Sequence, residues 1–184
     1  GQLWEMNPDG SNPRQVTDIP DGINGYVYAP DMSKIVYLKD VQLEPTVQDL
    51  YPDLPKAKAR IVDDQFYRHW NDWVDAYTHL FIADYVPAQP ITTGKDIMEG
   101  ERWESPVRPW GGVEQLAWTK DGKKLIYTCR KKIGIDYAES TNTDLYAYNT
   151  ENGETVNLTE GMMGYDKNPV ISPNGLGKYG TGRL

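Results

Sequence analysis

The sequence predicts an all-β protein built from repeated four-stranded units, and three observations predict it. Tyrosine (13) and tryptophan (6) are abundant among the 184 residues, and large rings favour strands. Glycine (17) and proline (13) are frequent and spread along the chain, which favours many turns. Short apolar stretches recur on both sides of these turns. The length is enough for one ordinary domain with a substantial core.

The first predicted element is a β-hairpin at Leu3 to Asp18, LWEMNPDGSNPRQVTD, in which a Pro-Asp-Gly-Ser turn joins two short strands. A lone hairpin is marginal in water because nothing covers its apolar face. The pattern recurs at Leu145, through YAYNTENGETVNLT with an Asn-Gly turn, and more loosely at Leu80, through ADYVPAQPITT. Asp-Gly and Asn-Gly supply the positive φ that two-residue hairpin turns require.

A second hairpin pattern follows the first. YAPDMSKIVY (28–37) and WTKDGKKLIY (118–127) match position for position, and a third copy begins at Ile171 as ISPNG. Each unit is therefore hairpin plus hairpin, and four-stranded units of roughly 40 residues are typical of β-propeller blades. The predicted fold is a partial β-propeller, with two blades plus most of a third and a long inter-blade insertion.

The expected organisation follows from these repeats. It comprises a blade at 1–40, an insertion at 41–77 made of loop plus a short helix, a blade with an extended loop at 78–132, and an incomplete blade with an irregular tail at 133–184. Propellers close with typically about 4–8 blades. We therefore expect a fragment of a longer protein whose exposed blade edges favour homo-oligomers.

The second half of the insertion, DDQFYRHWNDW, combines aromatic rings with charged groups. Trp70 and Trp73 stand three residues apart, a helical spacing, and Asp63 and Asp64 favour a helix start. A second excursion, EGERWESPVRPWGG (99–112), adds further rings, carboxylates and arginine. The functional interpretation is a recognition element on a rigid scaffold. The alternative is that the rings cover the blade below and Arg68 pairs with an aspartate.

The candidate substrate-binding residues share these two excursions. They are Arg68, His69, Trp70, Asp72, Trp73, Glu101 and Glu104.

Composition excludes several other classes of function. The chain carries 19 Lys plus Arg against 27 Asp plus Glu, a net charge of −8, which argues against a nucleic-acid partner. No apolar run of about 18 residues predicts a membrane span. Cys129 is the one cysteine, so no internal disulfide forms. One cysteine and two histidines do not build a typical zinc site, and we expect no metal or cofactor. We interpret His79 as structural.

These stretches carry a resemblance. The opening hairpin resembles the repeat of Tol-type periplasmic propellers. ARIVDDQFYRHWNDWVDAYTHLFIADY together with YAESTNTDLYAYNTENGETVNLTEGMMGYDKNPVISPNG resembles the N-terminal propeller of the prolyl oligopeptidase superfamily of serine peptidases, in its dipeptidyl peptidase 5-like and acylaminoacyl peptidase branch. The resemblance runs from about Leu3 to Gly175.

That resemblance implies a role without catalysis. The family places its Ser-Asp-His triad in a C-terminal α/β-hydrolase domain, with the serine in a Gly-x-Ser-x-Gly turn, and no serine of this sequence has those neighbours. We therefore assign no catalytic residue here. The implied function is the propeller portion of a secreted or periplasmic serine exopeptidase, which gates access and helps to recognise short peptides. The remaining blades and the hydrolase domain are its implied partners.

A peptidase that reads a free α-amine needs a carboxylate at the propeller mouth. The candidates are Asp72, Asp75, Glu101 and Glu104, while Arg68 suits a substrate carbonyl or carboxylate. Two alternatives come from other classes. One is a stand-alone Tol-type propeller that acts as a protein-binding scaffold. The other is a propeller lyase for acidic sugars, which two histidines disfavour because it needs a histidine-rich metal centre.

Overall fold

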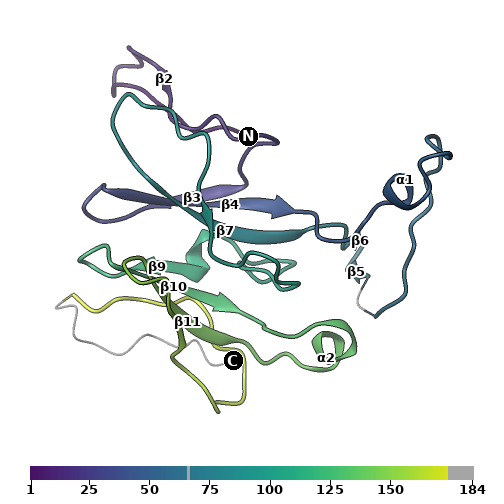
Figure 1. Cartoon of the computed structure of the whole chain (residues 1–184). Coiled ribbons are helices and arrows are strands. Elements are labelled where there is room, and N and C mark those ends of the chain that lie inside the picture. Colours follow the sequence, from purple (N-terminus) through teal and green to yellow (C-terminus); the bar gives the residue numbers. More distant parts are fainter. Residues whose placement is uncertain (66, 174–184) are drawn as a thin grey trace.

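The computed structural model describes residues 1–65 and 67–173, which form antiparallel sheets, and the two larger sheets stack on one another (Figure 1). Two of these sheets have four strands and two have two strands. The predicted tail after Gly175 and the ring of Phe66 lie outside the described residues. Among the helices that the structure describes, none is long and apolar enough to span a membrane.

The first four-stranded sheet has the strand order β3-β4-β7-β8. Its strands are β3 (Gly25–Tyr28), β4 (Lys34–Val41), β7 (Tyr77–Asp84) and β8 (Lys95–Asp96). The two central strands pair over eight residues, from Lys34 opposite Asp84 to Val41 opposite Tyr77. Four successive residues of β4, 35–38, are buried, which indicates that both faces of this sheet are covered.

The second four-stranded sheet has the order β9-β10-β11-β12 and begins after a short 3₁₀ helix. Its elements are η1 (Val113–Gln115), β9 (Leu116–Trp118), β10 (Lys124–Cys129), β11 (Asp144–Asn149) and β12 (Thr155–Asn157). Gly122 (φ 66°) and Gly153 (φ 78°) close the two hairpin turns. These are the Asp-Gly and Asn-Gly positions at which the sequence predicts positive φ.

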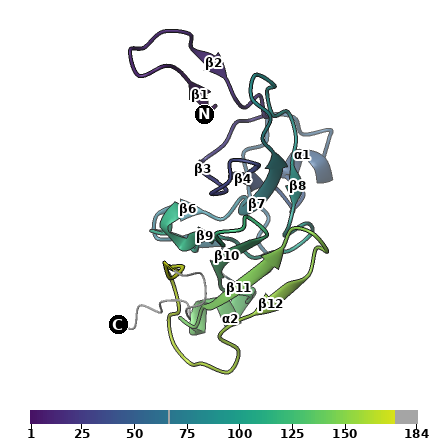
Figure 2. The ribbon, with the colours of Figure 1, turned by 90° about the vertical axis from the view of Figure 1, so that its left-hand side faces the viewer.

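The main core lies between the two four-stranded sheets, which stack face to face (Figure 1). Val36 and Leu80 meet Leu125 and Tyr127 there, and the indole nitrogen of Trp118 donates a hydrogen bond to the carbonyl of Val27 across the interface, at 3.2 Å. The two-stranded N-terminal hairpin, β1 (Trp4–Glu5) with β2 (Arg14–Gln15), leads into residues that pack on the outer face of the first sheet. Residues 158–171 cover part of the outer face of the second (Figure 2).

The observed sheets combine the hairpins differently from the predicted repeat units. The 28–37 hairpin joins the hairpin at Leu80 in one sheet, and the 118–127 hairpin joins the hairpin at Leu145 in the other. The opening hairpin forms its own sheet. The sheets therefore group the hairpins differently from the expected units, and the boundaries at 40, 77 and 132 stay a prediction. A repeat of alternating hairpins has no intrinsic start, and the eight-residue pairing of β4 with β7 decides the grouping.

The long insertion is also placed differently. It occupies residues 42–76, between the two central strands of one sheet, rather than between two blades. Its helix, α1 (Val47–Leu50), lies in the proline-containing half, where Thr46 and Asp49 form a capping box. The half predicted to be helical forms a hairpin of β5 (Arg68–His69) and β6 (Asp72–Trp73). The turn of this hairpin consists of residues 70 and 71, and Trp70 adopts the positive φ (50°) that a two-residue turn requires.

Truncating Leu80 tests the shared core. Leu80 is fully buried between the sheets, so Leu80→Ala should lower the free energy of unfolding by about 2–5 kcal/mol, through lost apolar contacts and the cavity left behind. Val156→Ala, at a side chain 57% exposed on β12, should change it by less than about 1 kcal/mol. Denaturant titration of both variants measures the difference, and equal effects would contradict the layered core.

Candidate functional site

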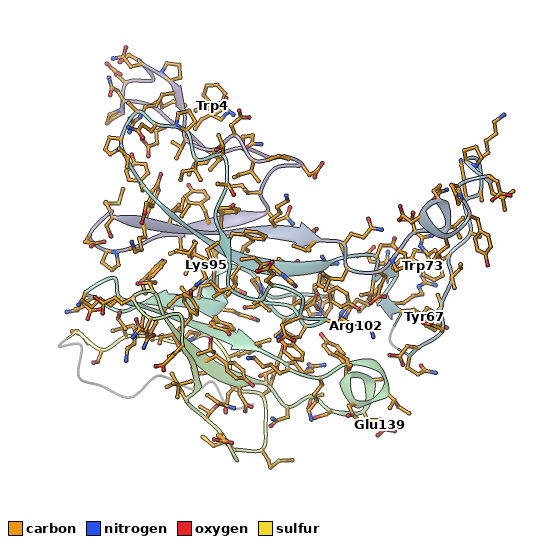
Figure 3. The ribbon with its side chains drawn as sticks, in the orientation of Figure 1. Trp4, Tyr67, Trp73, Lys95, Arg102 and Glu139 are labelled. Atoms are coloured by element: carbon orange, nitrogen blue, oxygen red, sulfur yellow. The ribbon has the colours of Figure 1, made fainter. Side chains whose placement is uncertain are left out.

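A cavity of about 710 Å³ lies where the insertion meets the two sheets. We call it the insertion cavity. Its walls come from the insertion, from the loop 97–112 that follows β8, and from the start of α2 (Gly134–Glu139). Figure 3 shows Tyr67, Trp73 and Arg102 on this side of the molecule. Three chain segments that are distant in sequence therefore build one concave surface.

A buried ion cluster forms part of the wall of this cavity, centred on Glu104, which is 3% exposed. One carboxylate oxygen, Oε1, lies 3.0 Å from His69 Nε2 and accepts a hydrogen bond from the Tyr137 hydroxyl at 3.3 Å. The other, Oε2, lies 3.2 Å from Arg108 Nε. Burial and then the charge of Glu104 raise the pKa of Tyr137, so this hydroxyl stays protonated and donates. The Glu104 carboxylate is thus engaged by three side chains.

The cluster continues into the first sheet through Arg108. A terminal nitrogen of Arg108 donates to Asp40 Oδ1 at 3.2 Å and to Thr78 Oγ1 at 3.1 Å. The Thr78 hydroxyl in turn donates to Asp40 at 2.6 Å. Asp40 and Thr78 stand where the chain leaves β4 and re-enters β7. The cluster therefore fixes the hairpin that carries His69 above the ends of these two strands.

Aromatic and guanidinium groups stack beside the cavity around Trp73. Arg60 and Arg68 lie over its ring at 4.6 and 5.0 Å from the centroid, and Tyr67 stacks on it at 6.0 Å. Arg60 also donates two hydrogen bonds to Asp75, at 2.9 and 2.8 Å, and these bonds lower the pKa of the Asp75 carboxyl. Such stacking holds the return arm of the insertion in place.

Arg102 connects both arms of the insertion to the loop 97–112. Its Nε lies 2.8 Å from Glu44 on the outgoing arm, and its terminal nitrogen lies 3.8 Å from Asp64 on the returning arm. A hydrogen bond with Tyr77 and the nearby carboxylates raise the pKa of Arg102, which keeps the guanidinium charged. These contacts link the two arms of the insertion at its base, and we call them the Arg102 clip.

Removing the clip should loosen the insertion. Exposed ion pairs contribute about 0.2–1 kcal/mol each, so Arg102→Ala should accelerate tryptic cleavage after Lys56 and Lys58 by about 3- to 10-fold. Lys123→Ala removes the exposed pair with Glu151 elsewhere and should leave that rate unchanged. Mass spectrometry of timed digests measures both. Equal rates in the wild type and in Arg102→Ala would show that the clip does not restrain the insertion.

A second cavity, of about 740 Å³, lies on the other side of His69, which lines both cavities. Its lining includes Asp72 from the hairpin, Arg108, residues 24–26 at the start of β3, and residues 111–114. We call it the hairpin cavity. The buried ion cluster therefore stands between two concave surfaces, with the β5–β6 hairpin over both.

The structure brings together some of the predicted site residues and separates others. His69, Trp73 and Glu104 line the insertion cavity, and Arg68 stacks on Trp73 next to it. Asp72 lines the hairpin cavity, and Trp70 stands at the tip of the same hairpin. Arg68 donates to the carbonyl of Asn71, at 2.9 Å, rather than to an aspartate.

Glu101 lies apart from this group. Its backbone carbonyl is 3.0 Å from His79 Nε2, and His79 Nδ1 lies 2.8 Å from Asp96. His79 itself is fully buried, in agreement with a structural role. Among the residues that the structure describes, no group of three or more His, Cys, Asp or Glu side chains is arranged to hold a metal ion.

Sequence reasoning missed Arg60, Arg102 and Tyr137 as parts of the site. Arg102 lies in the excursion 99–112, so its charge could have marked it as a candidate site residue. Tyr137 belongs to another segment altogether, and only the packing of α2 against the insertion brings it to Glu104.

Comparison with known proteins identifies relatives that are peptidases by name. The chain is 47% identical over 180 residues to dipeptidyl-peptidase 5 of Porphyromonas endodontalis, covering 98% of this chain and 26% of that protein. It is 48% identical over 154 residues to dipeptidyl-peptidase 5 of Porphyromonas gingivalis, covering 84% of this chain and 22% of that protein. Over most of its own length the chain is therefore similar to dipeptidyl-peptidase 5 proteins, and it spans about a quarter of the length of these curated relatives.

More distant comparisons add little. A probable dipeptidyl-peptidase 5 of Aspergillus niger is 26% identical over 142 residues, covering 64% of this chain and 19% of that protein. No family model matches the chain. The crystal structure of TolB from Acinetobacter baumannii aligns over 95% of this chain and 41% of that one, at 19% identity and with a TM-score of 0.35.

Proposed function

We propose that this chain is a non-catalytic propeller portion of a serine exopeptidase, which gates access to the active site and helps to recognise short peptides. The observation that carries the proposal is the 47% identity to a dipeptidyl-peptidase 5 over 98% of the chain, a span that includes the insertion and both cavities. Two four-stranded antiparallel sheets stacked face to face are consistent with neighbouring propeller blades.

The geometry narrows the choice of the carboxylate that binds a peptide amine. Glu104 is buried and engaged by His69, Tyr137 and Arg108, and Asp75 is held by Arg60. Asp72 is exposed, lines the hairpin cavity, and makes no ion pair with any other described residue. In this proposal the Asp72 carboxylate binds the α-amine, and Arg68, which precedes the cross-strand partner of Asp72 on β5, is the candidate for binding the peptide carbonyl.

Gating follows from the same elements. The insertion and the loop 97–112 lie over the ends of the central strands of the first sheet and are held there by the ion cluster and the Arg102 clip. Excursions fixed in this way restrict the size of the substrate that passes. In this proposal the peptide passes these excursions on its way to the catalytic domain of the parent enzyme.

The test uses the full-length parent enzyme and a short peptide with a free amine. Charge-assisted hydrogen bonds contribute about 1.5–3 kcal/mol, so Asp72→Asn should lower kcat/KM by about 10- to 100-fold, and Arg68→Ala should lower it in the same direction. Asp53→Asn, at an exposed aspartate of the same insertion, is the control and should match the wild type. Unchanged kcat/KM in both Asp72→Asn and Arg68→Ala would refute the proposed recognition site.

A further inference from the structure

The insertion cavity exposes a group of large apolar side chains. Four residues of its lining are 45–52% exposed, namely Leu50, Ile61, Val62 and Ile133. Soluble proteins rarely gather exposed apolar side chains in one place, and such a group is typical of a ligand or partner site. The cavity volume of about 710 Å³ lies within the range of about 300–1,000 Å³ that small-molecule sites have.

These apolar groups come from separate parts of the chain. Leu50, Ile61 and Val62 belong to the insertion, whereas Ile133 immediately precedes α2. The loop 97–112 adds the ring of Trp103 to the same lining. An apolar ligand in this cavity would therefore remove surface of three segments from water, and the burial of that surface favours binding.

The carboxylates in the lining are nearly all engaged. Those of Glu44, Asp64 and Asp75 contact arginine side chains, and that of Glu104 belongs to the buried ion cluster. Asp63 is the lining carboxylate that makes no ion pair with another described residue. The cavity therefore offers little free negative charge to a ligand.

Two ammonium groups in the lining are free to bind a ligand. Lys58, which is exposed on the insertion, and Lys132, which is partly buried before α2, make no ion pair with any other described residue. They outnumber the free carboxylate of Asp63, so the unpaired charge of the lining is positive. The hairpin cavity differs, because its lining includes the exposed carboxylates of Asp72 and Glu114. Positive charge beside apolar surface attracts a ligand with an apolar body and an anionic end.

We propose that the insertion cavity binds a fatty carboxylate, whose chain packs on the exposed apolar side chains and whose carboxylate contacts Lys58 and Lys132. An aliphatic chain suits this lining better than a peptide does, because peptide amides need hydrogen-bond partners and most polar groups of the lining are engaged. The buried ion cluster separates this site from the hairpin cavity. The inference does not depend on the proposed function.

The test is isothermal titration calorimetry of the full-length parent with decanoate, below the concentration at which decanoate forms micelles. Decanoate should bind. Each methylene group added between octanoate and decanoate should tighten binding by about 2- to 4-fold, because more apolar surface leaves water. Decanamide has the same chain without the charge and should bind at least about 10-fold more weakly.

Variants of the lining assign the binding to this cavity. Lys132→Gln should weaken decanoate binding by about 10-fold, and the more exposed Lys58→Gln by about 2- to 5-fold. Lys120→Gln, at an exposed lysine outside both cavities, is the matched control and should bind like the wild type. Ile133→Asp should weaken binding by at least about 10-fold through charge repulsion, whereas Val86→Asp, at an equally exposed side chain elsewhere, should not.

The outcomes decide both the site and the class of ligand. Absence of decanoate binding to the folded parent, or equal affinities of the wild type, Lys132→Gln and Ile133→Asp, would refute the site. An N-acetylated leucine peptide with a free carboxylate is titrated alongside, and it should bind more weakly than decanoate. Tighter binding of the peptide would overturn the assignment to fatty carboxylates. None of these titrations measures peptide cleavage, so their failure would leave the proposed function standing.

Discussion

Replacing Glu104 by alanine is expected to lower the free energy of unfolding by about 3–5 kcal/mol. The substitution leaves His69, 7% exposed, and the partly buried Arg108 without the carboxylate that both contact. Removal of one partner from a buried ion pair has a cost of this size. The β5–β6 hairpin, which enters the cluster through His69, should become more mobile than the sheets below it.

A graded set of variants separates charge from shape at this position. Glu104→Gln keeps the volume and part of the hydrogen bonding, so its cost should be about 1–3 kcal/mol. Glu151→Ala removes half of an exposed ion pair with Lys123 and should cost less than about 1 kcal/mol. Denaturant titration measures all three. A cost for Glu104→Ala no larger than that for Glu151→Ala would rule out a structural role for the cluster.

The single cysteine gives a second large effect. Cys129 is fully buried, burial raises the pKa of its thiol, and its Sγ donates to the Glu104 carbonyl at 3.4 Å. Alkylation needs an exposed thiolate, so the folded chain should react at least about 1,000-fold more slowly than the chain in denaturant. Timed reaction with iodoacetamide, read by mass spectrometry, measures this ratio.

The same thiol reports on the ion cluster. If alkylation requires unfolding, a loss of about 3–5 kcal/mol in Glu104→Ala should accelerate it by about 100- to 4,000-fold, since about 1.4 kcal/mol corresponds to a factor of ten. Glu151→Ala should leave the rate close to that of the wild type. A fast reaction in the wild type would show that Cys129 is accessible without unfolding and that the second sheet is less tightly packed than the structure indicates.

Local sequence signals predicted the hairpins but not their grouping. Asp121-Gly122 and Asn152-Gly153 turn where the sequence indicates, because these dipeptides adopt the required backbone locally. The assignment of hairpins to sheets depends on which strands pair over long distances, and the 34–41 pairing with 77–84 crosses the whole insertion. The Trp70–Trp73 spacing fits a helix, yet a two-residue turn places them on a hairpin instead.

The arrangement of the candidate site residues, whose role stays a prediction, could be expected from the sequence only in part. The two excursions concentrate rings and charges, and the structure brings His69 and Glu104 into contact from both of them. Composition did not reveal that Glu104 and Asp75 are already engaged, because pairing with Arg108 and Arg60 depends on three-dimensional packing. Nor did it indicate that Trp70 and Trp110 meet, since forty residues separate them in the sequence.

One measurement tests the central claim most directly. The full-length parent, isolated from its source, would be treated with a fluorophosphonate that labels activated serines, and the labelled peptide would be mapped. The account predicts a labelled serine in a Gly-x-Ser-x-Gly sequence outside the 184 residues of this chain, with this chain supplying the recognition surface. A folded parent that takes up no label, or one labelled at a serine within this chain, would contradict that account and favour a protein-binding scaffold in the first case.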